Sequence, residues 1–212
     1  FSSFWKPHSP FEVPVPFDSM YDDITIPLPE EQTLKKIRRL PLPLRALILR
    51  GQPVYDIDRT RLQWMLRSYY GSISHVDREV GLILKTLQET GQADNTIVVF
   101  WADHGWKLGD HSSWCKHTNF ECDTRVPLII HHPRMPSVTG NTDALVELID
   151  LYPTLCDLCG LDRPKHLQGK SLVPVLQDPS TSFRRSAYSS YPHGRGRGRP
   201  PVVGHTHRPA RH

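Results

Sequence analysis

The sequence predicts an α/β fold, and three observations support this class: a long amphipathic helix, two short apolar runs, and the order in which they alternate. The segment from Arg61 to Glu89 repeats apolar residues at intervals of three and four, and it stops at Gly91. The run from Thr96 to Trp101 follows, and the run from Val126 to His131 comes after a long polar loop. This alternation predicts a three-layer core built round a mixed, mostly parallel sheet.

The other segments have weaker patterns. The run from Thr96 to Trp101 is β-branched and aromatic, which is typical of a parallel strand covered on both faces. A second helix is expected from Ala144 to Cys159, with Gly160 as its C-cap. Residues 1–5 read as the end of a strand and residues 6–32 as a proline-rich loop, whereas residues 33–50 fit no single element.

The composition is that of an ordinary globular protein, with 38% hydrophobic and 23% charged residues among 212. No segment approaches the roughly 20 consecutive apolar residues of a membrane span, so no span is expected. The opening residues lack the start methionine, the basic region and the long apolar region of a signal peptide. They look cut from a longer protein.

The net charge of +4 arises at the C-terminal end of the chain. Residues 193–212 contain five arginines, four histidines and no acidic residue, so the remaining 21 Lys and Arg nearly balance 22 Asp and Glu. This tail of Gly, Pro, Arg and His has too few apolar residues to fold by itself, and it is expected to be disordered or an aberrant terminus. A polyanion-binding arm is the alternative, but no nucleic acid is expected as a partner.

The four cysteines do not form a metal site by their spacing. Cys156 and Cys159 form a C-x-x-C pair on the apolar face of the expected second helix, and no second pair stands at zinc-finger spacing. No strand precedes the pair as in a thioredoxin-type motif. Buried thiols in the core are therefore the prediction.

An acidic and an imidazole side chain follow the first apolar run. Asp103 and His104 stand just past its end, where open α/β sheets bind ligands, and this position indicates a metal or anion site. Alternatively, Asp103 caps the next helix and His104 is a loop histidine.

The long polar loop that follows is of a kind that is usually functional. Chemistry on a sulfate or phosphate ester needs a cation, positive groups for the oxygens, a nucleophile and a proton donor. The loop can supply the cation ligands and a lysine, and His8 can supply the proton.

These residues resemble a known family. Three motifs carry the resemblance in and after the loop: Asp103–His111 (DHGWKLGDH), Trp114–Glu121 (WCKHTNFE) and Val126–Ile129 (VPLI). Three others fit the same pattern: Lys6–Phe11 (KPHSPF), Tyr69–Asp77 (YYGSISHVD) and Leu145–Leu155 (LVELIDLYPTL). Together they resemble the type I sulfatases of the alkaline phosphatase superfamily, most nearly the iduronate-2-sulfatase group and its bacterial relatives, over roughly residues 4–192.

The resemblance implies an alkaline phosphatase/sulfatase-like sandwich that is incomplete in this chain. Residues 1–160 then match the C-terminal part of the catalytic domain, and residues 161–192 match the start of the smaller C-terminal subdomain. Residues 193–212 are the basic tail. Asp103 and His104 match two ligands of the family's single Ca²⁺, an ion that takes about 6 to 8 mostly oxygen ligands, so this pair alone cannot complete the site.

The resemblance also implies catalytic roles. Lys116 matches the lysine that contacts the sulfate oxygens, and His8 matches the histidine that helps the alcohol to leave. His117 and Asn119 match positions that contact the sugar. Without the resemblance, Lys116 reads as a solvated loop lysine and His8 as a turn residue.

One departure concerns the nucleophile. The family uses a formylglycine made from the cysteine of a C-x-P-S-R segment, and none of the four cysteines here stands in that context. The family's early Asp-Asp ligands also lack a match, because Asp22 and Asp23 follow the His8 motif. The chain is therefore expected to be the later half of a catalytic domain, inactive alone, with the formylglycine upstream.

The resemblance implies that the intact protein is a sulfuric ester hydrolase acting on a sulfated sugar, a glycosaminoglycan-type substrate or another sulfate ester. The alternatives are a phosphate or phosphonate monoesterase of the same superfamily and a non-catalytic truncated fragment. The family implies a periplasmic, secreted or lysosomal location.

Overall fold

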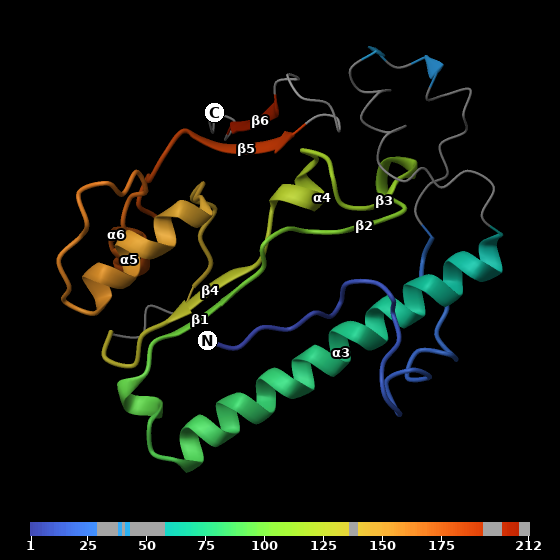
Figure 1. Ribbon diagram of the computed structural model, residues 1–212, viewed down its shortest axis with the longest axis horizontal. Helices are drawn as coiled ribbons and strands as arrows, with labels where there is room; N and C mark the ends of the chain where they lie inside the picture. The colour runs from blue at the N-terminus through green and yellow to red at the C-terminus, as the bar shows by residue number, and fades with distance from the viewer. Residues whose placement is uncertain (29–37, 40, 43–57, 136–139, 193–200, 208–212) are drawn as a thin grey trace. The chain divides into compact units, whose positions relative to one another are not determined.

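The computed structural model describes residues 1–28, 38, 39, 41, 42, 58–135, 140–192 and 201–207 (Figure 1). These residues belong to two compact units. The first unit comprises Phe1–Asn95 and Asp103–Thr118, and the second comprises Thr96–Ala102 and Asn119–His212. Most of the stretch 33–50, which the sequence leaves unassigned, lies outside the described residues. Over the described residues, no helix combines the length and the apolar character that a membrane span requires.

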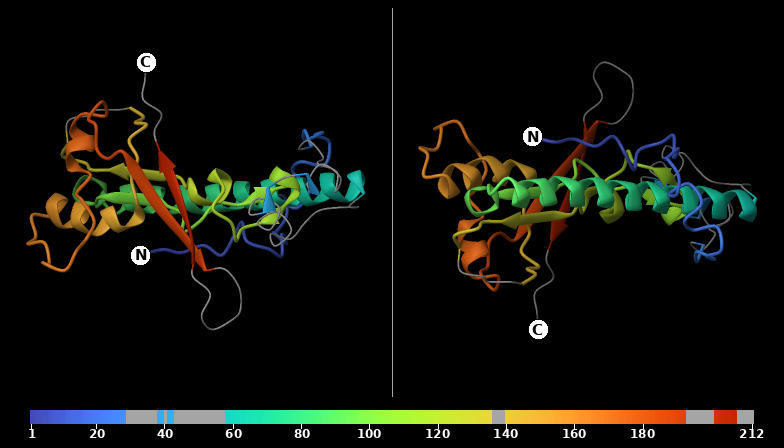
Figure 2. Two further views of the ribbon diagram at one scale, coloured as in Figure 1. Left: turned by 90° about the horizontal axis from the view of Figure 1, so that it is seen from above. Right: turned by 90° about the horizontal axis from the view of Figure 1, so that it is seen from below.

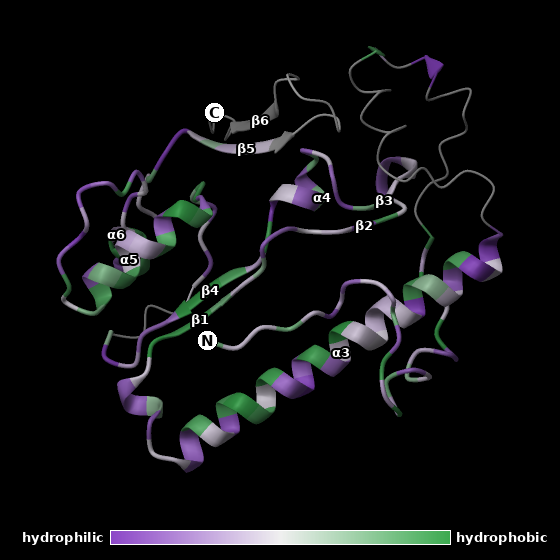
Figure 3. Cartoon of the chain, viewed as in Figure 1, coloured by the Kyte–Doolittle hydropathy of each residue, from purple (hydrophilic) through white to green (hydrophobic). Residues whose placement is uncertain are grey.

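Helix α3 (Arg59–Glu89) is the main element of the first unit, and it confirms the helix expected from residues 61 to 89. Both views in Figure 2 show it as one unbroken rod. Apolar and polar residues alternate along the rod, as the helical periodicity requires (Figure 3). The C-cap is Thr90, and Gly91, with a φ of 68°, adopts the left-handed conformation that glycine takes without strain. A 3-10 turn, η1 (Ala93–Asn95), follows.

The N-terminal segment, residues 1–28, is irregular and is attached to α3. The strand expected at residues 1–5 is wrong, because these residues and the turns after them form no strand among the described residues. Prolines follow closely in the chain, and each removes a backbone donor that a strand ladder would need. The Ile26 N–H donates to Gln63 Oε1 at 3.2 Å, and the hydroxyl oxygens of Tyr21 and Ser74 lie 2.7 Å apart. These bonds join the proline-rich loop to the helix.

A small hairpin completes the first unit. β2 (Lys107–Leu108) pairs antiparallel with β3 (Trp114–Cys115), and the 3-10 turn η2 (Asp110–Ser112) connects them. Trp114 packs with Ile26 and Leu66 in the hydrophobic core of the unit. The core therefore joins the hairpin, the N-terminal segment and α3.

The second unit contains the two expected apolar strands. β1 (Val98–Trp101) pairs with β4 (Leu128–His131), and Figure 3 shows both as hydrophobic. The pairing is antiparallel, and in this chain Phe100 and Ile129 are 39% and 61% exposed, so the parallel pairing and the cover on both faces that the sequence predicts are not present among the described residues. An apolar run specifies a strand but not the direction of its neighbour, which depends on the path of the connecting chain. All three sheets of the described residues are two-stranded and antiparallel, so these residues do not by themselves form a mostly parallel sheet.

The second expected helix is shorter than the sequence indicates. It consists of the 3-10 turn η3 (Leu148–Asp150) and helix α5 (Leu151–Leu158), because a capping box between Glu147 and Asp150 sets its start. Cys156 is buried, as expected for a core thiol. Cys159 is exposed, which corrects the prediction for that residue, since it lies beyond the last turn as the C-cap.

Two short helices and one hairpin complete the second unit. Helix α4 (Glu121–Thr124) precedes β4, and α6 (Val173–Gln177) follows α5. β5 (Ser186–Pro192) pairs antiparallel with β6 (Pro201–His207), and the two strands lie side by side in both views of Figure 2. Part of the basic tail therefore forms a strand, which corrects the expectation of a tail without structure. Backbone pairing with β5 needs no apolar core of its own.

Candidate active site

The sequence-predicted residues His8, Asp103, His104, Lys116 and His117 all belong to the first unit. His8 lies in the N-terminal turns, whereas the other four lie in the polar loop that carries β2 and β3. Asn119, the remaining candidate for a sugar contact, belongs to the second unit.

Asp103 and His104 place two ligand atoms near each other. The carboxylate oxygen Oδ2 of Asp103 lies 3.5 Å from Nε2 of His104, and the Asp103 side chain is 78% exposed. The Nδ1 of His104 lies 2.8 Å from the carbonyl oxygen of Gly105, and because a carbonyl only accepts, Nδ1 carries a proton. With Nδ1 protonated, the neutral form of the ring has its lone pair on Nε2, beside the carboxylate.

The alternative role of Asp103 as a helix cap is not what the structure shows. No helix begins directly after Asp103, and its Oδ1 accepts the backbone N–H of His104 at 3.0 Å. Oδ2 is the carboxylate oxygen that lies near His104 Nε2. An oxygen and an imidazole nitrogen 3.5 Å apart can bind one cation, since ligand bonds to Ca²⁺ are about 2.3–2.6 Å long. Within the described part of the chain, no three His, Cys, Asp or Glu residues are grouped to hold a metal, so the pair supplies only part of such a site.

Trp106 lies at the centre of a cluster of side chains that includes several of the predicted site residues. Five side chains surround its ring, with centroid distances of 5.2 Å for His8, 6.2 Å for Phe11, 6.4 Å for Tyr69 and 6.3 Å for His104, and an Nζ-to-centroid distance of 5.5 Å for Lys116. They come from the N-terminal turns, from α3 and from the polar loop. The sequence motifs contain Trp106 and Tyr69, but sequence reasoning did not assign them a role. Each of their two motifs contains an aromatic residue beside the polar ones, and this is the signal that could have indicated a role for Trp106 and Tyr69.

His8 is held on several sides. Its ring lies 4.9 Å from that of Trp5 and meets Trp106 edge-on at 70°. Its Nδ1 lies 2.8 Å from the carbonyl oxygen of Ser9 and so donates a proton to it, and its backbone N–H donates to the Trp5 carbonyl oxygen at 3.1 Å. Nε2 is therefore the ring nitrogen left to exchange a proton with another molecule.

Lys116 stands in a strained stretch of backbone. Its neighbours Cys115 and His117 have φ values of 65° and 85°, and His111 and Ser112 have φ values of 53° and 54°. Residues with a Cβ seldom adopt this left-handed region, which costs on the order of 1–3 kcal/mol each and is found mainly at functional sites. Lys116 is half-buried, with its ammonium over the Trp106 ring, whereas His117 is exposed.

Tyr69 closes the cluster from α3. Its ring stacks on Trp106 with an interplanar angle of 27°, and Phe11 meets it edge-on at 5.6 Å. Burial raises the pKa of Tyr69 to about 12, and the neighbouring Tyr70 adds to the shift. Tyr69 therefore stays a neutral phenol at physiological pH, and its ring packs against Trp106 and Phe11.

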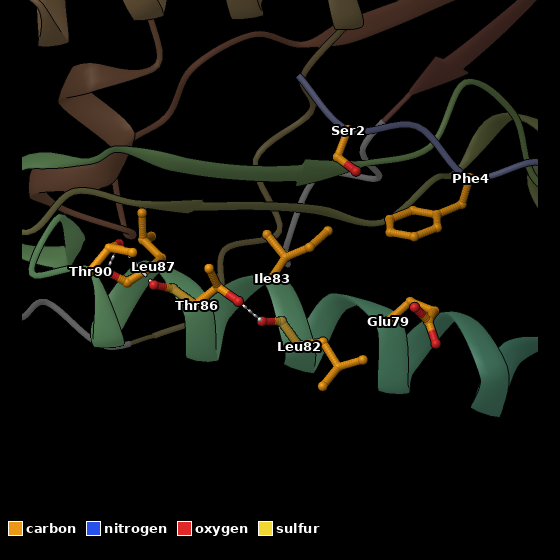
Figure 4. Close-up of a pocket in the computed structure, with 8 residues that line it drawn as sticks. All are labelled: Ser2, Phe4, Glu79, Leu82, Ile83, Thr86, Leu87 and Thr90. Carbon is orange, nitrogen blue, oxygen red and sulfur yellow. Dashed lines mark hydrogen bonds between the residues drawn. The ribbon is translucent and has the colours of Figure 1, made fainter.

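A second feature of the first unit is an apolar groove along the C-terminal half of α3 (Figure 4). It encloses about 590 Å³, and its lining residues are Ser2, Phe4, Glu79, Leu82, Ile83, Thr86, Leu87 and Thr90. None of the predicted site residues lines it. The groove is therefore separate from the cluster around Trp106.

Two solved structures that resemble this chain show what its fold is similar to. A phosphonate monoester hydrolase of Agrobacterium radiobacter matches with a TM-score of 0.77 and 31% identity, over 90% of this chain and 40% of that one. A protein solved in complex with its substrate D-glucosamine-2-N,6-O-disulfate matches with a TM-score of 0.64 and 30% identity, over 70% of this chain and 31% of that one. The structural neighbours are consistent with the predicted α/β class.

The sequence identifies the family within this class. The Sulfatase family pattern matches residues 1–161, so the chain belongs to the sulfatase family. A sulfatase of Formosa agariphila is 32% identical over 82% of this chain, and human iduronate 2-sulfatase is 32% identical over 88%. The chain spans 34% and 44% of the length of these two relatives. The predicted family is thereby confirmed.

Proposed function

We propose that the whole protein containing this chain is a sulfuric ester hydrolase whose site includes the cluster around Trp106. The observation that carries this proposal is the convergence of His8, His104 and Lys116 on one indole ring. These residues are far apart in the sequence, and each was expected at a sulfate site on the basis of family resemblance. Membership of the sulfatase family supports the same chemistry.

Lys116 binds the oxygens of the sulfate group. Its ammonium is a compact positive charge over the Trp106 ring, and Lys116 is half-buried, so a charge interaction there is stronger than in bulk solvent. Negative charge builds up on the sulfate oxygens as the ester bond breaks, so a fixed cation there lowers the barrier.

His8 gives a proton to the departing alcohol. Its Nδ1 is occupied by the bond to the Ser9 carbonyl oxygen, which fixes the ring and leaves Nε2 to hold and release the proton. The two tryptophan rings beside it restrict its rotation. A proton donor held in one orientation can act each time a leaving oxygen reaches Nε2.

Asp103 Oδ2 and His104 Nε2 would hold one side of a Ca²⁺ ion, which fits their separation of 3.5 Å. When bound, that ion supplies positive charge that orients the sulfate. The remaining ligands and the formylglycine nucleophile belong to segments outside this chain, because none of its cysteines lies in a C-x-P-S-R sequence. For this reason the 212-residue chain by itself is expected to have no turnover.

A sulfated sugar is the proposed substrate. The neighbour bound to D-glucosamine-2-N,6-O-disulfate and the N-acetylglucosamine-6-O-sulfatase of Bacteroides thetaiotaomicron, 34% identical over 62% of this chain, support this class. His117 is exposed beside Lys116, and we place it at the sugar. The proposed setting is periplasmic, secreted or lysosomal, with the three-layer sandwich completed by the rest of the protein.

Phosphonate monoester hydrolysis is the second candidate. Two phosphonate monoester hydrolase structures match with TM-scores of 0.76 and 0.77 over 87% and 90% of this chain. The test is to purify the whole protein and compare kcat/KM for an aryl sulfate and for an aryl phosphonate ester. A higher value for the sulfate supports the proposal. A higher value for the phosphonate makes the second candidate correct, and no hydrolysis of either ester refutes both.

A further inference from the structure

We propose that Trp106 is a positioning residue, whose indole ring holds the proton donor His8 and the cation Lys116 in one place. This inference deepens the proposed function and rests on it. It assigns Trp106 no contact with the substrate, because its effect on the reaction passes through the two side chains that it touches.

Trp106 contacts the two reactive groups in different ways. The His8 ring meets the indole edge-on at a centroid distance of 5.2 Å, and the Lys116 ammonium lies over the ring at 5.5 Å. Aromatic pairs favour such edge contacts, and tryptophan is the aromatic side chain that attracts a cation most strongly. The indole ring thereby restricts the positions of both the His8 imidazole and the Lys116 ammonium.

The indole itself is fixed from α3 and from the N-terminal segment. Tyr69 stacks on it at 27°, and Phe11 meets it at 77°. Phe11 also meets Tyr69 edge-on, so the three rings support one another. The longest helix of the unit therefore supplies the support for the site, through Tyr69.

The nitrogen of the indole shows that a hydrogen bond does not explain the presence of Trp106. Its Nε1 is buried, and it has no hydrogen-bond acceptor among the described residues. A buried N–H without an acceptor destabilises a fold, whereas phenylalanine would fill much of the same space without that cost. The larger indole face, with its stronger attraction for a cation, is what phenylalanine would not provide. Trp106 thus fits a role at Lys116 and His8 better than a role in stability.

The test is Trp106→Phe in the whole protein, assayed with an aryl sulfate. We expect kcat to fall by roughly tenfold to a hundredfold, as small misplacements of catalytic groups do, while the midpoint of thermal unfolding changes little. Trp64→Phe is the matched control, because Trp64 lies on α3, is 62% exposed and does not belong to the group around Trp106. In that control both kcat and the unfolding midpoint should stay near the parent values.

A double-mutant cycle separates positioning from a general structural effect. If Trp106 acts through Lys116, then Trp106→Phe lowers kcat far less in the Lys116→Ala background than in the parent. Equal fold losses in both backgrounds overturn the proposal, as does an unchanged kcat in Trp106→Phe alone.

A measurement of contact keeps the inference distinct from the proposed function. The imidazole proton resonances of His8 should move in Trp106→Phe, since the two rings touch, and unchanged resonances overturn the proposal. A parent protein that does not hydrolyse the aryl sulfate refutes the proposed function, whereas the resonances still decide whether Trp106 holds His8.

Discussion

The guanidinium of Arg184 donates to the carboxylate of Asp150 across 2.6 Å, and the Asp150 side chain is fully buried. The same carboxylate accepts the backbone N–H groups of Lys170 at 2.8 Å and Glu147 at 2.9 Å. The other arm of Arg184 donates to the Glu147 carboxylate. One buried charge therefore joins the start of α5 to the segments on either side of α6.

Loss of Arg184 should destabilise the protein strongly. Arg184→Met leaves the Asp150 carboxylate buried without its cation, a change that costs about 3–5 kcal/mol in comparable buried pairs. Arg163→Met is the control, because Arg163 is 52% exposed in its pair with Asp157, and such pairs contribute less than about 1 kcal/mol. Urea unfolding followed by circular dichroism measures both. Similar losses in the two variants would contradict a large contribution of the Arg184–Asp150 pair to stability.

Two glycines of α3 should respond oppositely to alanine. A Cβ at Gly71 would lie 2.2 Å from the carbonyl oxygen of Phe17, which must then move, whereas a Cβ at Gly81 meets nothing within 4 Å. Gly71→Ala should therefore destabilise by roughly 1–3 kcal/mol, as overpacking does. Gly81→Ala should stabilise by about 0.5–1 kcal/mol, because alanine loses less backbone entropy in a helix. Thermal unfolding compares them, and a stabilised Gly71→Ala variant would refute the close contact with Phe17.

The parts of the fold that the sequence predicts are those set by local patterns. Helix α3 follows from its 3.6-residue repeat, and strands β1 and β4 follow from their apolar runs. The sequence did not predict the antiparallel pairing of β1 with β4. The relative direction of two strands depends on the path of the chain between them, and the apolar residues of the strands do not encode it. Strand β6 was missed for a related reason, since its backbone is paired by β5 and its composition resembles an unfolded tail.

The sequence indicates which residues are candidates for the site, but it does not indicate how they are arranged. The family motifs indicated His8, His104 and Lys116, yet only the fold brings them to one ring. Trp106 stands inside the motif that supplied Asp103 and His104, and its contacts with Phe11 and Tyr69 depend on how α3 and the N-terminal turns pack. Long-range aromatic contacts of this kind have no periodic signature in the sequence.

The burial of Tyr69 should make stability depend on alkaline pH. Its pKa is raised to about 12 in the folded protein, whereas an unfolded tyrosine ionises near 10.0. Between these values the unfolded state binds fewer protons, so the free energy of unfolding falls as pH rises. The contribution of Tyr69 is complete below pH 10 and is lost as the pH reaches about 12. Tyr69→Phe should therefore lose stability less steeply in urea unfolding over this range. An identical pH dependence in parent and variant would show that Tyr69 ionises normally in the fold.

Lys116 should be the lysine of the polar loop on which sulfate ester hydrolysis depends. Lys116→Ala in the whole protein removes the ammonium that lies 5.5 Å from the Trp106 ring, and with it the charge proposed to meet the sulfate oxygens. Loss of one such group lowers kcat by about two to three orders of magnitude in comparable sites. Lys85→Ala is the matched control, because Lys85 is 68% exposed on α3, where it pairs with Glu89. Steady-state kinetics with an aryl sulfate compare both variants with the parent, together with unfolding curves that confirm equal folding. If Lys116→Ala and Lys85→Ala turn over the ester equally fast, Lys116 has no part in the reaction, and the cluster around Trp106 must be assigned another role.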